Sequence, residues 1–493
     1  MRRLAVLLLG LIVALAAIWQ LEAQRAGLEI TTRSVGETPV TRYAQPGAEG
    51  PVVVVAHGFA GSRQMMQAYA LDLARTGYRV WSFDFLGHGR NPVPMSGDVD
   101  SITGTTQRLV DQTSAVLDAA LTREGWTGQA AILGHSMATD IIIRTALAEP
   151  RVGPVVAISA FSQAVTAQAP ERLLLITGQW EPGLRGFARD AVAMVDPAAG
   201  EGETVRADGV VRRAVVAPLA EHVAVLYSRA GRAEAVAWLD AAYGRTSDGA
   251  VRATGPWLMA LMAAIVALAW PLSHLLAQRA PVPPAPLDAR RFALAVLGPA
   301  ARAPLLAVQV ETQVLPVLVA DYLALHLALF GGMQLALLAR FGLWPRGWSA
   351  IAVLALLAWG LGAFGFALDR YAANFWPTPE RAAIIAALAL GAVPFMLADA
   401  ALTLAGRAPL WQRLAARAAF VGSLALAVLL DTERLFFLAM IAPVIVLFFL
   451  VYGLMGRWVG ARAGVAGAGL ALGLILAWAL GVSFPLFAPA GAG

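Results

Sequence analysis

The sequence predicts an α/β domain with a mostly parallel sheet and helices on both faces, followed by an all-α bundle of transmembrane helices. Three observations support this fold class. Hydrophobic residues make up 58% of the chain and charged residues 14%, whereas a soluble domain carries about 25% charged residues. Short apolar runs alternate with amphipathic stretches in the first half. Apolar runs long enough to cross a bilayer fill the second half of the 493 residues.

The N-terminal segment, residues 1–22, has the pattern of an export signal. Arg2 and Arg3 precede a short apolar run from Leu4 to Trp19, and a basic start followed by a short apolar core is typical of secretory signals. A cleavage site of the small-x-small type does not follow, because Gln20 begins a polar stretch. We expect an uncleaved signal anchor, with a cleaved signal peptide as the alternative.

Residues 28–245 have the alternating pattern of an α/β domain. Short apolar runs predict strands over residues 51–56, 79–84, 130–134, 154–160, 172–178 and 212–217. Amphipathic stretches between them predict helices that include residues 64–76, 105–123 and 185–195. A continuous apolar run suits a strand buried on both faces, and strand–helix alternation predicts a mostly parallel sheet.

Residues 256–490 predict a multi-span helical domain of about six to eight spans. Residues 257–276 form an apolar run of spanning length, and a proline-rich linker follows at residues 280–286. Further candidate spans lie at about residues 314–338, 348–368, 382–402, 418–430, 435–454 and 463–487. The run at 418–430 is short, which makes it a candidate re-entrant segment, and residues 292–310 are a doubtful span.

Arginines predict the orientation of the first spans. Arg2 and Arg3 hold the N-terminus in the cytoplasm, and Arg279, Arg290 and Arg291 follow the next span, because basic residues remain on the cytoplasmic side. The α/β domain between them is therefore expected on the periplasmic or extracellular side. We expect an integral membrane protein of a bacterial inner membrane, with the topology of the later loops left open.

One segment carries the pattern of a serine nucleophile. The apolar run before residue 134 leads into the pentapeptide GHSMA at residues 134–138. A nucleophilic serine on a sharp strand-to-helix turn needs small residues two positions before it and two positions after it. Gly134 and Ala138 meet this demand, with alanine in place of the more usual second glycine. Ser136 is thus a candidate nucleophile, and a helix N-cap serine is the alternative.

Two further segments carry a resemblance to a known family. His57-Gly58 and the segment Asp84–Gly89 follow the first two central strands with His-Gly and Gly-His-Gly turns. Together with the GHSMA motif, in this order and spacing, they resemble the α/β-hydrolase superfamily, and most closely its esterase, lipase and serine-aminopeptidase-like branch. The resemblance covers residues 40–245. It implies that Ser136 is the nucleophile and that the backbone N–H groups of Phe59 and Met137 form the oxyanion hole.

The resemblance also implies the partners of Ser136, because the family's triad runs in the order serine, acid, histidine. Of the histidines in the α/β domain only His222 follows the serine, and it lies just after the strand at 212–217. Glu181, after the strand at 172–178, is the implied acid, where the family more often has aspartate. Asp190 and Asp196 are the alternatives for the acid.

The other histidines of the α/β domain have supporting roles in this prediction. We expect His57, Gly58 and His88 to stabilise turns, and His135 to pack beside the nucleophile or line the pocket. The alternative for His222 is an ordinary surface-loop histidine.

Composition excludes several other classes of site. The sequence contains no cysteine, which excludes disulfides, thiolate metal sites and a cysteine nucleophile. It shows no metal-ligand spacing, phosphate-binding loop or dinucleotide fingerprint, so we expect neither a metal nor a cofactor. The basic residues are all arginines scattered between apolar runs, so nucleic-acid binding is not expected.

The sequence therefore predicts a membrane-anchored serine hydrolase that cleaves a carboxylic ester or related acyl bond through an acyl-enzyme intermediate. The expected partners are the bilayer and a small-molecule or lipid acyl substrate. A serine peptidase or acyltransferase with the same triad is an alternative. Asp321, His326 and Asp399 interrupt apolar runs, and such charges are often functional. A transporter with an accessory α/β domain, or a catalytically inactive binding domain, therefore stays open, as does the oligomeric state.

Overall fold

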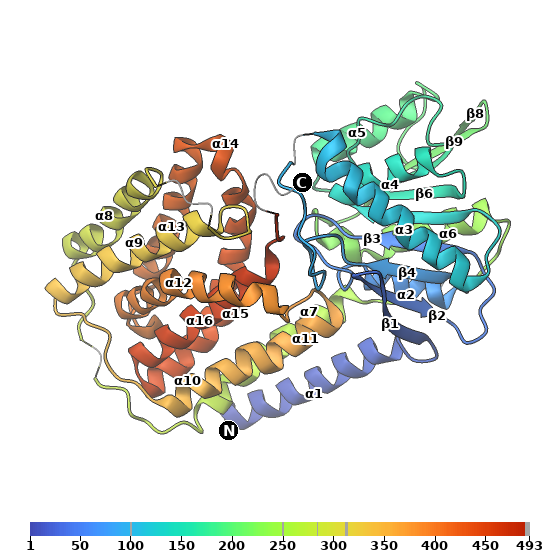
Figure 1. Ribbon diagram of the computed structural model, residues 1–493. Helices are drawn as coiled ribbons and strands as arrows, with labels where there is room; N and C mark the ends of the chain where they lie inside the picture. Colours follow the sequence, from blue (N-terminus) through green and yellow to red (C-terminus); the bar gives the residue numbers. More distant parts are fainter. Residues whose placement is uncertain (99–100, 249–250, 283, 311–313, 489–493) are drawn as a thin grey trace. The chain divides into compact units, whose positions relative to one another are not determined.

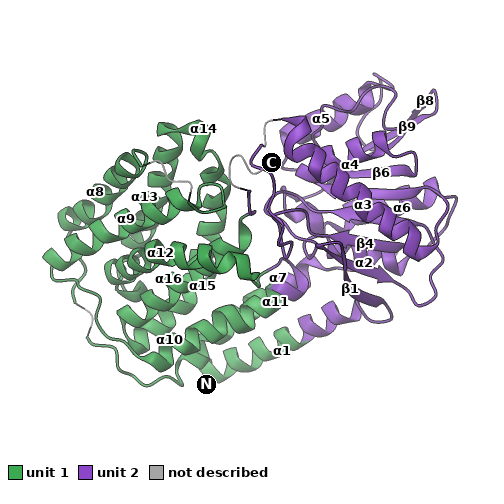
Figure 2. Ribbon diagram, in the orientation of Figure 1, with its two compact units in different colours: residues 1–15, 261–368, 375–484 green, residues 16–260, 369–374, 485–493 purple. Residues whose placement is uncertain are grey.

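The computed structural model describes residues 1–98, 101–248, 251–282, 284–310 and 314–488, and Figure 1 shows its helices and strands. The chain divides into two compact units, which Figure 2 colours separately. Unit 1 contains residues 1–15, 261–368 and 375–484, and unit 2 contains residues 16–260, 369–374 and the end of the chain from 485. The division falls within the helices α1 (Arg2–Ala23), α7 (Gly255–Ser273) and α11 (Gly365–Tyr371).

Unit 2 is built on one sheet, which has nine strands within the described residues and the order β1-β2-β4-β3-β5-β6-β7-β9-β8. The strands are β1 (Glu29–Val35), β2 (Thr38–Ala44), β3 (Val52–Ala56), β4 (Arg79–Phe83), β5 (Ala130–His135), β6 (Val152–Ile158), β7 (Arg172–Gly178), β8 (Thr204–Ala207) and β9 (Val210–Ala217). The six strands from β4 to β9 in this order are parallel. The strands β1, β2 and β8 are antiparallel to their neighbours.

Helices cover both faces of this sheet. They are α2 (Gln67–Arg75), α3 (Gln107–Glu124), α4 (Met137–Ala148), α5 (Pro182–Ala193) and α6 (Arg229–Ala242), with short helices η1 (Ile102–Thr106) and η2 (Ala224–Tyr227). The helices α3 and α4 pack together over β3, β5 and β6, whereas α2 and α6 contact each other and lie over β4, β7 and β9. The predicted α/β class is confirmed, because strands and helices alternate around a mostly parallel sheet.

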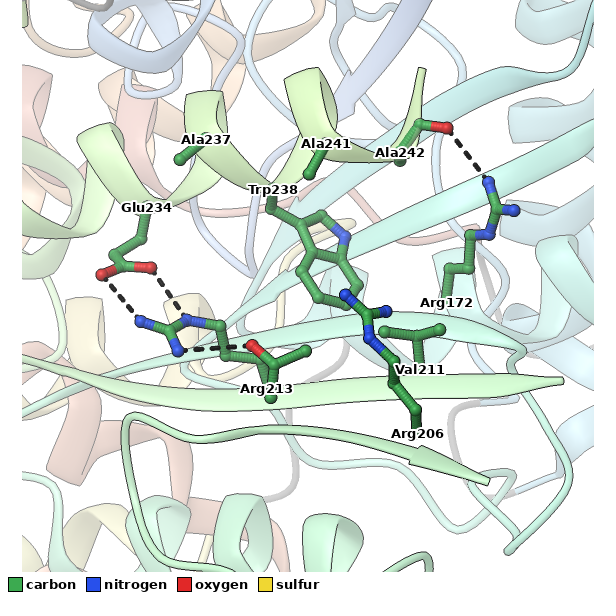
Figure 3. A pocket seen from close by; sticks show the side chains of 10 residues that line it. Arg172, Arg206, Val211, Arg213, Glu234, Ala237, Trp238, Ala241 and Ala242 are labelled. Atoms are coloured by element: carbon green, nitrogen blue, oxygen red, sulfur yellow. Dashed lines mark hydrogen bonds and ion pairs between the residues drawn. The ribbon is translucent and has the colours of Figure 1, made fainter. Parts of the chain in front are cut away.

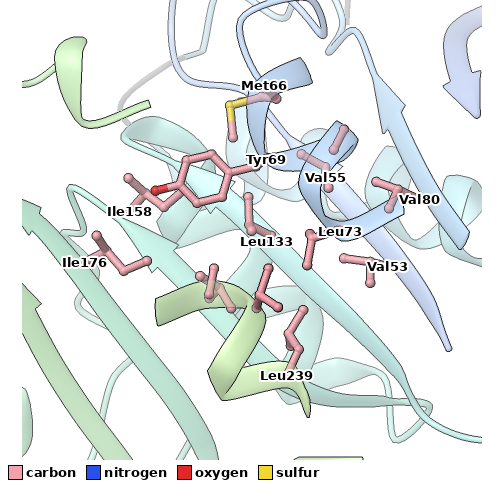
Figure 4. Packing of buried hydrophobic residues seen from close by; sticks show 14 of the residues in the cluster. Val53, Val55, Met66, Tyr69, Leu73, Val80, Leu133, Ile158, Ile176 and Leu239 are labelled. Atoms are coloured by element: carbon pink, nitrogen blue, oxygen red, sulfur yellow. The ribbon is translucent and has the colours of Figure 1, made fainter. Parts of the chain in front are cut away.

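The core between the sheet and the helices α2 and α6 explains the apolar runs. Figure 4 shows Val53, Val55 and Leu133 from the sheet packed against Tyr69 of α2 and Leu239 of α6. Each of these side chains is at most 1% exposed. Central strands with helices on both faces are buried on both sides, which is why their sequences are continuously apolar rather than alternating.

The sequence prediction missed all three antiparallel strands, and for the two edge strands, β1 and β8, the reason is physical. The strand β1 lies at the edge of the sheet and has one hydrogen-bonded neighbour, β2. Its sequence, EITTRSV, is polar and mostly exposed, so it lacks the apolar run by which the buried strands were found. The strand β8 is a four-residue edge strand with the same property.

Unit 1 is helical within the described residues. Its helices are α7, α8 (Ala289–Ala307), α9 (Ala320–Arg340), α10 (Ala350–Leu357), η3 (Ala358–Phe364), α11 (Gly365–Tyr371), η4 (Pro379–Arg381), α12 (Ala382–Leu402), η5 (Leu404–Gly406), α13 (Leu410–Leu430), α14 (Thr432–Leu435), α15 (Phe437–Ala463) and α16 (Val465–Ser483). Eight helices of the described chain, α1 among them, are long and apolar enough to cross a membrane. Large apolar side chains such as Leu354, Leu390 and Leu429 are exposed on them, as lipid-facing side chains would be.

The helix α13 corrects the sequence prediction for residues 418–430. The structure begins this helix at Leu410, so it has 21 residues and is long enough to cross a membrane. Arg413 and Arg417 fall near the beginning of this helix and lower the local hydropathy, so the sequence analysis placed its start too late. The last predicted span, residues 463–487, is likewise shorter, because the helix α16 ends at Ser483.

Small residues allow the helices of unit 1 to pack closely around α12. A Cβ atom on Gly391 would lie 2.2 Å from the carbonyl oxygen of Ala324 in α9, and one on Gly473 of α16 would lie 2.6 Å from the Cα of Val393. Such contacts are possible only for glycine. Close backbone approach at small residues is a usual way for membrane helices to associate.

Candidate active site

The candidate active site lies at the carboxyl ends of the parallel strands. The register pairs His135 at the end of β5 with Ile158 at the end of β6, and Gly178 at the end of β7 with Ala217 at the end of β9. These ends therefore lie along one edge of the sheet, and the loops that follow them meet there. Ligand sites of parallel α/β sheets form at this edge.

Ser136 occupies a strained turn between β5 and α4. Its backbone angles are φ 56° and ψ −123°, a region that non-glycine residues rarely adopt. A Cβ atom on Gly134 would lie 3.0 Å from the Cβ of Ala138. The tight turn thus requires small side chains at both positions, for the reason that the sequence pattern predicted.

Ser136, His222 and Glu181 form one hydrogen-bonded chain. The Ser136 Oγ lies 2.8 Å from the His222 Nε2, and the His222 Nδ1 lies 2.5 Å from the Glu181 Oε1. A carboxylate only accepts, so the His222 Nδ1–H is the donor to Glu181. The Nε2 of the neutral ring is then the acceptor for the serine hydroxyl. The His222 side chain is 44% exposed and the Glu181 side chain 5% exposed, so the site is open on the histidine side and closed behind the carboxylate.

Glu181 is held by donors on both of its oxygens. The Oε2 accepts hydrogen bonds from the Ser159 hydroxyl at 2.7 Å and from the Gly178 amide at 2.6 Å. Burial disfavours the ionised form, but the hydrogen bonds from His222, Ser159 and the Gly178 amide together lower the pKa of this carboxyl below its usual value. The carboxylate therefore stays ionised and fixes the orientation of the imidazole.

His135 holds the loop that carries His222. Its Nε2 lies 2.8 Å from the carbonyl oxygen of His222, so the Nε2–H donates to that carbonyl. The two rings lie 4.8 Å apart. Burial, aided by the nearby His222, lowers the pKa of His135 to about 3, so the ring stays neutral. The sequence prediction placed His135 beside the nucleophile, and the structure adds this contact with the candidate base.

The turn after β3 lies directly against the candidate nucleophile. A Cβ atom on Gly58 would be 3.0 Å from the Cβ of Ser136, so only glycine permits this approach, and Phe59 follows at once. His57 donates from Nδ1 to the carbonyl of Gly58 at 2.7 Å and accepts at Nε2 from the amide of Phe85 at 3.1 Å. Burial lowers the pKa of His57, which suits a neutral ring that both donates and accepts.

Met137 provides the other candidate oxyanion donor. It is the first residue of α4, which begins directly after Ser136. The N–H groups in the first turn of a helix lack acceptors within the helix and carry the positive end of its dipole. The sequence prediction for Phe59 and Met137 therefore corresponds to two backbone segments that both adjoin Ser136.

The loop from Asp84 to Asn91 stabilises this turn from the other side. Asp84 accepts hydrogen bonds from the Arg63 amide at 2.7 Å and the Arg90 amide at 3.0 Å, and it pairs with the Arg63 guanidinium. The ring of His88 lies 5.6 Å from that of Phe59, and its Nδ1 donates to the carbonyl of Leu86 at 2.8 Å. His88 thus packs against the turn that contains the candidate oxyanion donor.

A short segment from later in the chain is part of the same unit and contacts this loop. Within unit 2, the Arg90 Nε donates to the Asn374 Oδ1 at 3.0 Å, and the Arg90 guanidinium pairs with Asp369 at 2.7 Å. The amide of Asn374 donates to the hydroxyl of Ser62 at 3.0 Å. Asn374 thus contacts both loops that flank the candidate oxyanion turn.

Sequence reasoning located the central residues but missed several that support them. Asp190 and Asp196, the alternative acids, are both exposed. Ser159 was missed, although its position at the end of a predicted strand, on the same edge as the other site residues, was a usable signal. Asn374 had no such signal, because it lies 238 positions after Ser136 in the sequence. No cluster of three or more metal-ligating side chains occurs in the described part of the chain.

One protein family matches most of the α/β domain. Residues 48–220 match the family described as serine aminopeptidase, S33, which includes Ser136 and Glu181 and ends just before His222. No curated protein matches the chain. The match supports a hydrolase of the serine type.

Similar solved structures include a predicted CIB-like hydrolase from Thermoplasma acidophilum and an epoxide hydrolase from Vigna radiata. The first is 16% identical, with a TM-score of 0.34, over 43% of this chain and 97% of that one. The second is 24% identical, with a TM-score of 0.22, over 27% of this chain and 41% of that one. The present chain thus matches less than half of the epoxide hydrolase.

Proposed function

We propose, from the premise that residues 48–220 form an α/β-hydrolase domain, that this protein is a membrane-anchored serine hydrolase that cleaves a carboxylic ester or related acyl bond. The observation that carries the proposal is the hydrogen-bonded chain from Ser136 through His222 to Glu181, with Ser136 on a strained turn. A helix N-cap serine or a surface histidine has no need of this arrangement.

The proposed mechanism follows from the hydrogen bonds. His222 takes the hydroxyl proton of Ser136 at Nε2 while the Oγ attacks the carbonyl carbon of the substrate. The resulting imidazolium is stabilised by Glu181, which already accepts from Nδ1. His222 then returns the proton to the leaving group, and the ester bond breaks. Water, activated by His222 in the same way, releases the acid from the acyl-enzyme.

Negative charge on the carbonyl oxygen would be met by two amides. The Phe59 N–H follows the glycine that contacts Ser136, and the Met137 N–H lies at the start of α4. One such donor contributes about 3 kcal/mol to the stability of the transition state. Both amides belong to backbone segments that adjoin Ser136.

The residues around the triad favour a substrate with an apolar acyl group. Phe161, Trp180, Leu219 and Val223 are large, exposed and apolar, and each lies within three residues of Ser159, Glu181 or His222. Only residues 159–171 connect β6 with β7, which leaves no room for a large inserted lid there. This combination supports a small-molecule or lipid ester as the substrate, with the apolar helices as the membrane anchor.

Substitution of the serine tests the proposal. Ser136→Ala should reduce hydrolysis of p-nitrophenyl esters by about 10⁴-fold or more, since no other hydroxyl among the described residues is bonded to His222, and should abolish labelling by a fluorophosphonate probe. Ser114→Ala, on the helix α3, is the matched control and should keep full activity and labelling. Undiminished labelling of the Ser136→Ala protein would show that the nucleophile lies elsewhere.

The same assay separates ester hydrolysis from peptidase activity, the alternative suggested by the name of the matching family. We expect p-nitrophenyl esters of medium acyl length to be cleaved faster than aminoacyl p-nitroanilides, because the exposed residues near the triad are apolar. A preference for the anilides, lost in Ser136→Ala, would assign the same triad to a peptidase.

A further inference from the structure

A cavity in unit 2 lies away from the triad. It has a volume of about 450 Å³ and lies between the helix α6, the strand β9 and the hairpin strand β8. Arg172 and Val211, which line it, stand at the start of β7 and near the start of β9, whereas Glu181 and His222 follow the opposite ends of these strands. The cavity thus belongs to the other edge of the sheet and is not part of the candidate active site. Binding cavities for small molecules have volumes of about 300–1,000 Å³.

Two arginines of this cavity, Arg172 and Arg206, form no ion pair with a carboxylate of the described residues. Figure 3 shows Glu234 paired with Arg213, at 3.0 and 3.1 Å, so this acid is already occupied. The Arg172 side chain makes one hydrogen bond, from Nη1 to the carbonyl of Ala242 at 3.1 Å. The Arg206 side chain, on the edge strand β8, makes no hydrogen bond or ion pair with the described residues. The cavity therefore has two uncompensated positive charges.

Trp238 supplies a third donor without an acceptor. This side chain is 8% exposed, and its Nε1 has no hydrogen-bond partner among the described residues. Figure 3 shows its indole extending from α6 toward Val211, with the nitrogen on the side of Arg172 and Arg206. Buried polar atoms are nearly always hydrogen-bonded, and an indole N–H can only donate. The unpartnered N–H therefore indicates a missing acceptor.

The chemistry of the cavity matches one class of ligand. The side-chain groups of Arg172, Arg206 and Trp238 that face no acceptor are all donors, and the net side-chain charge of the lining, two positive units, matches the charge of a phosphate monoester. Guanidinium groups bind phosphate oxygens through paired hydrogen bonds. The indole of Trp238, with Val211, Ala237 and Ala241, provides an apolar wall for the body of the ester. A carboxylate ligand would offer fewer acceptor oxygens than a phosphate monoester and half of its negative charge.

We propose that this cavity is a binding site for a phosphate monoester with an apolar or aromatic body. Arg172 and Arg206 bind the phosphate oxygens, the Trp238 N–H donates to a third oxygen, and the organic group packs against the indole. The site is distinct from the triad, and its existence does not depend on the proposed hydrolase activity.

Titration calorimetry on the full chain in detergent tests this site with phenyl phosphate as the probe. We expect a Kd below about 1 mM, weakened at least about tenfold by Arg206→Gln, which removes a charge-assisted contact. Trp238→Phe keeps an aromatic ring and removes the N–H, so it should weaken binding about threefold to tenfold. Arg206 is exposed, so its substitution should leave the thermal unfolding midpoint unchanged.

Two variants serve as controls for the binding experiment. Arg108→Gln on α3 is the matched arginine control, and Ser136→Ala tests independence from the triad; both should bind phenyl phosphate like the unmodified protein. Phosphatidic acid in mixed micelles, tested in parallel, shows whether the monoester can be part of a lipid. Inorganic phosphate that binds as tightly as phenyl phosphate would overturn the assignment of an organic body. No saturable binding up to about 10 mM, or equal binding by Arg206→Gln, would overturn the site.

Discussion

Individual residues at the candidate active site combine strained backbone with fully satisfied polar groups. Ser136 and Ser159 have positive φ angles of 56° and 52°. Ser136 follows directly after the last residue of β5, and Ser159 follows directly after the last residue of β6. Strain of this kind persists only where surrounding contacts determine the conformation. Here the Ser159 hydroxyl donates to Glu181, and the Ser136 amide donates to the carbonyl of Ile158 at 2.9 Å.

A glutamate can serve as the acid because its longer side chain is held at both oxygens. Oε1 accepts from His222, and Oε2 accepts from Ser159 and from the amide of Gly178. A Cβ atom on Gly178 would lie 2.9 Å from Oε2, so the glycine leaves room for the carboxylate. The longer arm thus folds back toward its own strand and does not extend past the imidazole.

Replacement of this acid is the sharpest test at the residue scale. Glu181→Gln keeps the shape but presents an amide to the His222 Nδ1, which favours the wrong tautomer, and we expect kcat to fall by about 10²–10⁴-fold. Steady-state hydrolysis of p-nitrophenyl esters measures the change. Asp190→Asn, at the exposed alternative acid, should leave kcat unchanged. A fall in kcat for Asp190→Asn, with no fall for Glu181→Gln, would show that Asp190 is the acid.

Among the elements, the helix α8 is the one whose relation to the membrane the sequence left doubtful. It is not among the eight candidate spans of the described chain, because Arg290, Arg291 and Arg302 lower its hydropathy. The helix α8 nevertheless lies alongside the helix α13 over the whole length of both helices. Gln412 donates to the carbonyl of Leu287 at the beginning of the two helices, and Arg434 donates to the carbonyl of Val308 at their end.

Chain connectivity supports the same interpretation of α8. Residues 16–260 and 369–374 belong to one unit, and segments of one unit lie on the same side of a membrane. The chain therefore has to cross the membrane an even number of times between them. Between these segments the candidate spans are α7, α9 and the helix of α10 and α11, which is an odd number. A crossing by α8, whose 19 residues extend about 28 Å, makes the number even.

We therefore expect α8 to be a ninth crossing, and the absence of cysteine makes a direct test possible. Single variants Ala285→Cys and Val314→Cys place a thiol before and after α8, and Glu203→Cys marks unit 2. A membrane-impermeant maleimide applied to intact spheroplasts should label Val314→Cys and Glu203→Cys alike and should leave Ala285→Cys unlabelled until lysis. Equal labelling of the two α8 variants would show that the helix does not cross.

At the scale of the whole molecule, the hydrolase unit is assembled from segments that are distant in sequence. Residues 369–374, and residues 485–488 with the bridge between Phe487 and Met95, belong to unit 2. The amide of Met95 donates to the carbonyl of Leu486 at 2.8 Å, and the amide of Leu486 donates to the carbonyl of Gly87 at 2.9 Å. Loops beside the candidate oxyanion turn therefore depend on chain that follows the apolar helices.

This assembly predicts that a residue far from the triad in sequence affects hydrolysis. Asn374→Ala removes the acceptor of the Arg90 Nε and a contact to the Gly89 carbonyl at 3.4 Å. The loss of such buried hydrogen bonds has an effect of about 1–2 kcal/mol, so we expect kcat/KM for p-nitrophenyl esters to fall about tenfold. Fluorophosphonate labelling should slow in proportion. Gln309→Ala, an exposed amide in the other unit, should have no effect, and an unchanged rate in Asn374→Ala would refute the coupling.

The sequence by itself determined the class of the fold and the central residues of the site. Buried parallel strands are continuously apolar, a nucleophile turn needs small residues, and apolar runs of 20 residues suit a bilayer, so each of these features leaves a local pattern. Such patterns were enough to identify Ser136, the turn at Gly58 and the strand ends. They did not identify the edge strands, because a strand with an exposed face has no continuous apolar run.

Only the tertiary structure decided which side chains meet. The sequence allowed Glu181, Asp190 or Asp196 as the acid, and the pairing of strand ends brought Glu181 to His222. The donors from Ser159, His135 and Asn374, and the cavity beside Trp238, depend on contacts between residues far apart in the chain. No local pattern reports such contacts, because they arise from the packing of whole elements and not from the propensities of neighbouring residues.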